Sequence, residues 1–154
     1  MLQELIDDPF YVEYAMYNEC VLDYCIVKSD SETVNHKDVV IFAMNCWNKK
    51  YDLDFSVDEN KMESKKIDVK DFFNEEYERL FLKPPYMTMY SKKDFNHINE
   101  LLFPNGTNDL EIYDWNTDWS DYFEEGLEWW GIRLVSILDK SLNRFIVIGA
   151  SATD

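Results

Sequence analysis

The stretch GIRLVSILDKSLNRFIVIGA, residues 131–150, carries the clearest structural signal in the chain. Two apolar runs, 131–138 and 144–150, flank the polar connection DKSLN, which is the pattern of a β-hairpin with a five-residue loop. Both runs are apolar at successive positions, so both faces of each strand must be covered. We therefore predict that the hairpin lies centrally in a sheet covered by helices.

The first half of the chain is expected to supply helices. Asp8-Pro9 resembles a helix N-terminus, and apolar residues that recur at spacings of three and four predict a helix over residues 9–27. The run VVIFAM, residues 39–44, favours a helix, although a buried strand remains the alternative. Residues 52–67 are polar and irregular in pattern.

The middle of the chain continues this pattern. Phe73, Tyr77, Leu80 and Phe81 mark a helix that Pro84-Pro85 must end, because proline lacks the amide donor and clashes with the preceding turn.

Two short strands and one capped helix are expected between residues 86 and 115. The stretch YMTMY, 86–90, alternates like a strand, and Ser91-Lys-Lys-Asp94 resembles a capping box before a helix. The stretch LEIYDW, 110–115, predicts a strand with Leu110 and Ile112 on one side. The fold class expected is α+β, with N-terminal helices packed on an antiparallel sheet that ends in the C-terminal β-hairpin. Residues 1–154 are expected to form a single domain, because there is little glycine or proline for a linker.

Charge is the main clue from composition. The chain has 31 acidic and 15 basic residues, for a formal net charge of −16. Such a protein repels nucleic acid phosphates and anionic membrane surfaces, so we expect neither as a direct partner and a basic protein instead. The cysteines Cys20, Cys25 and Cys46 form no CxxC motif and favour free thiols in a reducing, cytoplasmic compartment.

Motifs for catalysis or metal binding are weak. Asp114, Asn116, Asp118 and Glu125 match ligand positions of an EF-hand loop, but Trp119 stands where that loop needs glycine. With 31 acidic residues, carboxylate pairs arise by chance. We expect no metal ion, cofactor or catalytic residue.

Histidines leave one enzymatic alternative open. His97 and Glu100 are three residues apart on an expected helix and could share a face, while His36 lies in no zinc-binding pattern.

Negative charge is concentrated late in the chain. No lysine or arginine occurs between Asp94 and Ile132, and four of the five tryptophans lie there. Aromatic rings beside carboxylates suit an interface with a basic protein, although rings packed in the core are the competing interpretation. The expected partner-binding residues are Asp109, Glu111, Asp114, Trp115, Asp118, Trp119, Asp121, Glu124, Glu125 and Glu128.

The last 35 residues or so carry a resemblance to a class of known proteins. DYFEEGLEWWG followed by RFIVIGASATD resembles the ends of small bacterial immunity proteins, which neutralise toxin domains delivered between cells. The resemblance implies a small, cytosolic, acidic protein that binds a cognate toxin, often a nuclease. It implies no particular fold.

These observations favour a non-catalytic inhibitor that occludes a site on a basic antibacterial toxin domain with an acidic, aromatic-rich surface. Two alternatives stay open. One is a nucleic-acid-mimicking anti-defence protein, and the other is a small enzyme that uses His97 with Glu100 or a carboxylate pair.

Overall fold

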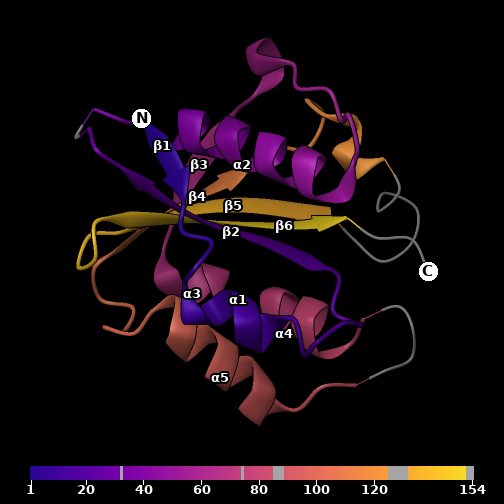
Figure 1. Cartoon of the computed structure of the whole chain (residues 1–154), viewed down its shortest axis with the longest axis vertical. Helices are drawn as coiled ribbons and strands as arrows, with labels where there is room; N and C mark the ends of the chain where they lie inside the picture. The colour runs from indigo at the N-terminus through magenta and orange to yellow at the C-terminus, as the bar shows by residue number, and fades with distance from the viewer. Residues whose placement is uncertain (32, 74, 85–88, 125–131, 152–154) are drawn as a thin grey trace.

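The centre of the molecule is one antiparallel sheet. The computed structural model describes residues 1–31, 33–73, 75–84, 89–124 and 132–151. Its six strands are ordered β1-β2-β6-β5-β4-β3 (Figure 1). They are β1 (Leu2–Glu4), β2 (Leu22–Ser29), β3 (Ser64–Ile67), β4 (Leu110–Trp115), β5 (Ile132–Asp139) and β6 (Arg144–Ser151). The predicted α+β class is confirmed, and the β5–β6 hairpin occupies the two central positions.

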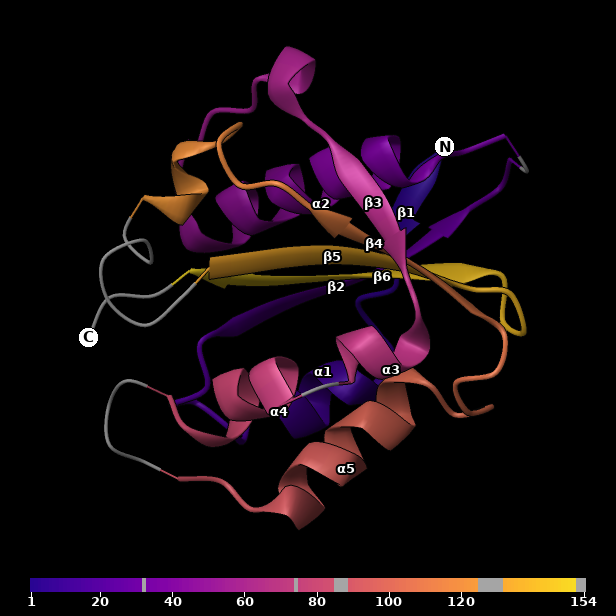
Figure 2. The same cartoon turned by 180° about the vertical axis from the view of Figure 1, so that it is seen from behind.

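Helices cover both faces of this sheet. The α-helices are α1 (Pro9–Tyr14), α2 (His36–Tyr51), α3 (Val69–Phe72), α4 (Glu75–Leu82) and α5 (Lys92–Leu102), and the 3-10 turns are η1 (Glu59–Lys61) and η2 (Asp121–Phe123). Helix α2 and turn η2 lie on the face drawn uppermost in Figure 1, and the other four α-helices lie on the opposite face (Figures 1 and 2). We call these the upper and lower faces.

The central strand β6 explains why two covering layers are needed. Phe145 and Val147 point into the upper core, and Ile146 and Ile148 point into the lower core. Successive strand residues point to opposite faces, so an apolar run of this kind cannot leave either face in water. The predicted central position of the hairpin is therefore confirmed.

A buried arginine joins the lower layer to the sheet. Arg144, the first residue of β6, donates to Asp8 Oδ2 at 2.7 Å and to the carbonyls of Leu101 and Leu102 at 3.3 and 2.8 Å. Asp8 is also the N-cap of α1 and accepts from Phe10 N at 3.0 Å. The guanidinium thus neutralises the α1 cap carboxylate and satisfies carbonyls at the C-terminal end of α5.

The predicted helix over 9–27 is wrong beyond its first turns. Helix α1 ends at Tyr14, and the chain returns as β2 from Leu22. The aromatic residues that suggested a helix instead meet in the lower core from two separate elements. The centroid of the Tyr24 ring lies 4.9 Å from that of Phe10 and 4.8 Å from that of Tyr14. Local periodicity could not distinguish this reversal from a continuous helix.

The other predicted elements fare better. The run 39–44 lies within α2, the helix before Pro84 is α4, and strand 110–115 is β4. The capping box is present, because Ser91 Oγ accepts from Asp94 N at 3.2 Å while Asp94 accepts from Ser91 N at 3.0 Å. The irregular interpretation of 52–67 missed β3, an edge strand with exposed polar residues. The expected strand 86–90 falls mainly outside the described residues.

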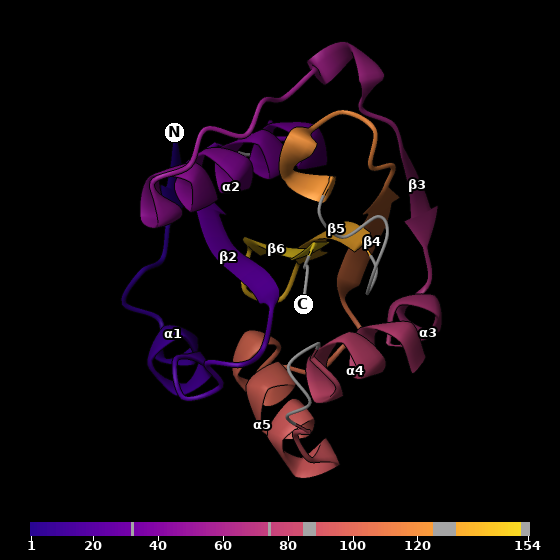
Figure 3. The same ribbon diagram turned by 90° about the vertical axis from the view of Figure 1, so that its right-hand side faces the viewer.

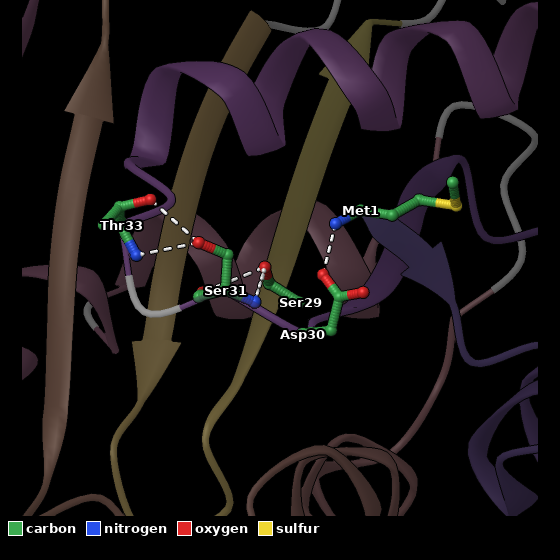
Figure 4. A network of polar contacts seen from close by, with 5 residues as sticks. All are labelled: Met1, Ser29, Asp30, Ser31 and Thr33. Atoms are coloured by element: carbon green, nitrogen blue, oxygen red, sulfur yellow. Dashed lines mark hydrogen bonds and ion pairs between the residues drawn. The ribbon is translucent and has the colours of Figure 1, made fainter.

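The turn after β2 is held by short polar side chains (Figure 4). Ser31 N donates to Ser29 Oγ at 3.0 Å, and the hydroxyls of Ser31 and Thr33 lie 2.8 Å apart. The Met1 nitrogen contacts the Asp30 carboxylate. The contact of Met1 with Asp30 attaches the start of the short edge strand β1 to the turn after β2.

Membrane-spanning helices are not found in the described part of the chain, since none of its helices combines the required length with sufficient apolar character.

Gly149 on β6 allows aromatic side chains to approach the sheet closely. A Cβ at this position would lie 2.8 Å from the Tyr122 hydroxyl and 2.9 Å from the Trp47 ring. We predict that Gly149→Ala lowers the unfolding free energy by about 1–3 kcal/mol through overpacking, measured by chemical denaturation. The loss should be smaller in a Tyr122→Phe background, which removes the nearest atom. Equal losses in both backgrounds would show that the Tyr122 hydroxyl does not restrict this position.

Candidate functional site

Two segments that are far apart in the sequence form one acidic surface. Residues 52–63 follow α2, and residues 116–124 follow β4. Asp58 N donates to Trp119 O at 2.8 Å, and Ser56 N donates to Asp121 Oδ1 at 2.7 Å. Asn116 N donates to Glu63 O at 3.0 Å. Figure 3 shows the segment after α2 passing along the segment that carries η2. We call residues 52–63 and 116–124 the acidic loop pair.

The acidic loop pair is nearly free of basic residues. Its eight carboxylates belong to Asp52, Asp54, Asp58, Glu59, Glu63, Asp118, Asp121 and Glu124, and its single base is Lys61. A hollow of about 370 Å³ lies between the segments, with Asp58, Asp118, Asp121 and Glu124 in its lining. Asp118 and Glu124 are exposed, so their charges face solvent. This arrangement creates a concentrated negative potential at one surface.

The two predicted anchor tryptophans point inward. Trp119 is 1% exposed, and its indole nitrogen donates to Asn116 O at 2.5 Å. Trp115 is 7% exposed and donates to Ser136 Oγ at 2.8 Å. Both rings belong to the upper core, so they hold the loop in place and offer little surface to a partner.

Three other predicted acids lie outside the hollow. Asp109 is exposed but stands before β4, at the opposite end of that strand from Asn116. Glu111 accepts from His36 Nε2 at 2.9 Å and lies 3.9 Å from Lys140 Nζ. Asp114 lies 3.8 Å from Arg133 Nε, and its pKa is raised by burial against the opposing effect of that guanidinium. Of the predicted acids that the structure describes, it therefore brings together Asp118, Asp121 and Glu124, with Trp119 beneath them. Glu125 and Glu128 fall outside the described residues.

The sequence did not indicate that 52–63 belongs to the same surface. Its five acids are 55 or more positions from Asp118 in the chain, from Glu63 at 55 positions to Asp52 at 66. Only the hydrogen bonds between the two loops place them together.

A second polar arrangement lies between α2 and the sheet. Ser136 on β5 contacts His36 Nδ1 at 2.8 Å, and the other ring nitrogen contacts Glu111. Because the Glu111 carboxylate can only accept, His36 Nε2 carries the proton and donates to it, and Nδ1 of the neutral ring accepts from Ser136 Oγ, which accepts in turn from the Trp115 indole. Sequence reasoning missed this network because its members are up to 100 positions apart.

This Ser–His–Glu network is better suited to packing than to nucleophilic catalysis. The Ser136 side chain is 0% exposed, so a substrate cannot reach its hydroxyl in this conformation. Burial lowers the pKa of His36 from its ordinary value of about 6.5, despite the neighbouring Glu111 carboxylate. A neutral imidazole with both nitrogens bonded ties the first turn of α2 to β4 and β5. The adjacent pocket of about 520 Å³ is lined by apolar side chains, which include Met62, Tyr113 and Phe145, and by polar ones, which include His36 and Glu111.

The other histidine has a partner that differs from the expected one. His97 Nε2 lies 3.5 Å from Glu13 Oε2 on α1, and both side chains are nearly half exposed. The contact joins α1 to α5 at the surface, where ion pairs contribute little to stability.

Comparisons with known proteins add no further constraint. No protein-family model matches the chain, and neither a curated protein nor a solved structure shows significant similarity to it.

Neutral His36 should make stability depend on pH. Since the folded-state pKa lies below the unfolded value, the unfolded chain binds more protons in the window between them, and stability rises with pH there. We predict that the stability advantage of the wild-type protein over His36→Gln is largest above pH ~6.5 and shrinks on acidification below it. Denaturant unfolding of both proteins at several pH values measures this difference. A larger advantage at acidic pH would show that pairing with Glu111 outweighs desolvation.

Proposed function

We propose that this protein binds and inhibits a basic protein partner through the acidic loop pair. The observation that supports the proposal is a hollow shared by two distant segments that carry eight carboxylates and one lysine, with four of those carboxylates and Lys61 in its lining. Like charges held this close repel each other, and a cationic partner relieves that repulsion on binding. The surface differs from the aromatic-rich one expected from sequence, because recognition relies on carboxylates supported from below by Trp119.

The rigidity of the loop pair supports a binding role. Backbone hydrogen bonds join the two loops, and the buried Trp119 ring packs on Phe123 with centroids 5.3 Å apart. Ser56 N and its hydroxyl both contact Asp121 Oδ1, at 2.7 and 3.2 Å. A surface ordered before binding loses less conformational entropy on association, which favours affinity.

Among basic partners, we propose an antibacterial toxin domain of the nuclease type. Nucleases present lysine and arginine side chains to phosphates, and carboxylates on a rigid acidic surface could contact the same groups and block the substrate site. This part of the proposal depends on the resemblance of the C-terminal block to bacterial immunity proteins.

The electrostatic part of the proposal is tested by charge reversal. The double variant Asp118→Lys and Glu124→Lys changes two exposed carboxylates in the loop pair. The matched control is Asp7→Lys with Asp109→Lys, which makes the same change in net charge at two exposed positions outside the pair. Inhibition is assayed against a panel of basic bacterial nuclease domains, and association rates are measured with the domain that is inhibited.

We expect the wild-type association rate to fall as salt is raised and the loop-pair variant to associate at least about tenfold more slowly at low salt, because steering accelerates association by about 10–1,000-fold. The control should retain most of the wild-type rate. Rates that do not depend on salt, or equal losses in both variants, would contradict docking at this surface.

A further inference from the structure

Three side chains of types that bind metal ions meet between α2 and the strands β1 and β2. Strand β6 separates them from the His36 network, which contacts β4 and β5. The three side chains are Glu4 from β1, Cys25 from β2 and Cys46 from α2. One ligand atom from each residue lies within 4.8 Å of the other two. Cys25 is fully buried, whereas Glu4 and Cys46 are partly exposed, so the group can be reached from one side.

The spacing of these atoms suits a tetrahedral metal ion. Cys25 Sγ lies 3.6 Å from Glu4 Oε2. Zinc bonds of about 2.3 Å to sulfur and about 2.0–2.2 Å to oxygen, at a tetrahedral angle, place the two ligand atoms about 3.5–3.7 Å apart. Two thiolates and a carboxylate form a donor set that zinc accepts, and three protein ligands leave the fourth position open to water.

A neighbouring tyrosine orients the carboxylate. The Tyr11 hydroxyl donates to Glu4 Oε2 at 2.7 Å and accepts from Ile26 N at 2.8 Å. The tyrosine hydroxyl thus connects the carboxylate of Glu4, the last residue of β1, to the backbone of β2. Hydrogen bonds of this kind to metal-binding carboxylates hold the ligand in place and tune its affinity.

The charges of the group also suit a cation. A divalent ion bound by these three residues would take up both sulfurs as thiolates and release their protons to solvent.

We propose that Glu4, Cys25 and Cys46 bind one zinc ion, which joins the edge strand β1 to β2 and α2. The three-residue β1 is also held by its ladder with β2, by the contact of Met1 with Asp30 and by the Tyr11 bridge from Glu4 to Ile26. The ion would add a link at the other end of the strand. The proposal differs from the expectation of no metal ion. No local motif indicated this site, because Cys25 lies 21 positions after Glu4 and Cys46 lies 21 positions after Cys25.

The site is tested with the full-length protein, stripped with chelator and kept in a non-thiol reductant so that the cysteines cannot oxidise to a disulfide. Zinc affinity is measured by competition with a chromophoric chelator. Cadmium is then titrated while the ultraviolet thiolate-to-metal charge-transfer band is recorded. We expect one ion per chain and a band with the intensity of two thiolates.

Three variants locate the ligands. Cys46→Ser should reduce the charge-transfer band by about half, and Tyr11→Phe should weaken zinc binding about 10–100-fold, as for other residues that orient a metal ligand. Cys20→Ser removes the remaining cysteine, whose thiol lies in the lower core, and should leave binding unchanged. Circular dichroism confirms that each variant is folded. Failure of the folded wild-type protein to take up zinc, or unchanged binding in Cys46→Ser, would overturn the proposal.

Discussion

The structure depends on the burial of both faces of the β5–β6 hairpin. Ile146 and Ile148 require a lower layer, and Phe145 and Val147 require an upper one. The strands therefore occupy the centre of the sheet, where each is paired with a neighbour on both sides. All other elements are arranged by this requirement: four helices below, α2 and η2 above, and short polar strands at the two edges (Figures 1 and 2).

Helix α2 has a role beyond covering the upper core, because it places polar side chains against the sheet at both of its ends. His36 in its first turn meets Ser136 and Glu111 from β5 and β4. Cys46, three turns later, meets Cys25 and Glu4 from β2 and β1. Buried polar groups are costly unless they find partners, so each group on the helix is matched by one on a strand. The first set completes its hydrogen bonds internally, whereas the second leaves a donor set suited to a cation.

The acidic loop pair shows how the core supports a charged surface. Trp119 fixes residues 116–124 from beneath, and the hydrogen bond from Asp58 N to Trp119 O extends that support to residues 52–63. Mutual repulsion of the carboxylates destabilises this arrangement. Burial of the Trp119 indole and its hydrogen bond to Asn116 O stabilise the arrangement and offset the repulsion. Trp115 and Trp119 thus lie inside, whereas Asp118 and Glu124, which neighbour them in the sequence, face solvent.

Periodicity and composition by themselves determined the fold class, the central hairpin, α4, α5 and the net negative charge, and they favoured a helix over a buried strand at α2, because each depends on local pattern or on counting residues. Three features needed the tertiary structure: the reversal between Tyr14 and Leu22, the direction in which Trp115 and Trp119 point, and the meeting of residues 52–63 with 116–124. The same is true of Glu4, Cys25 and Cys46. Contacts between residues dozens of positions apart arise from strand order and helix packing, and a single sequence carries no local signal of either.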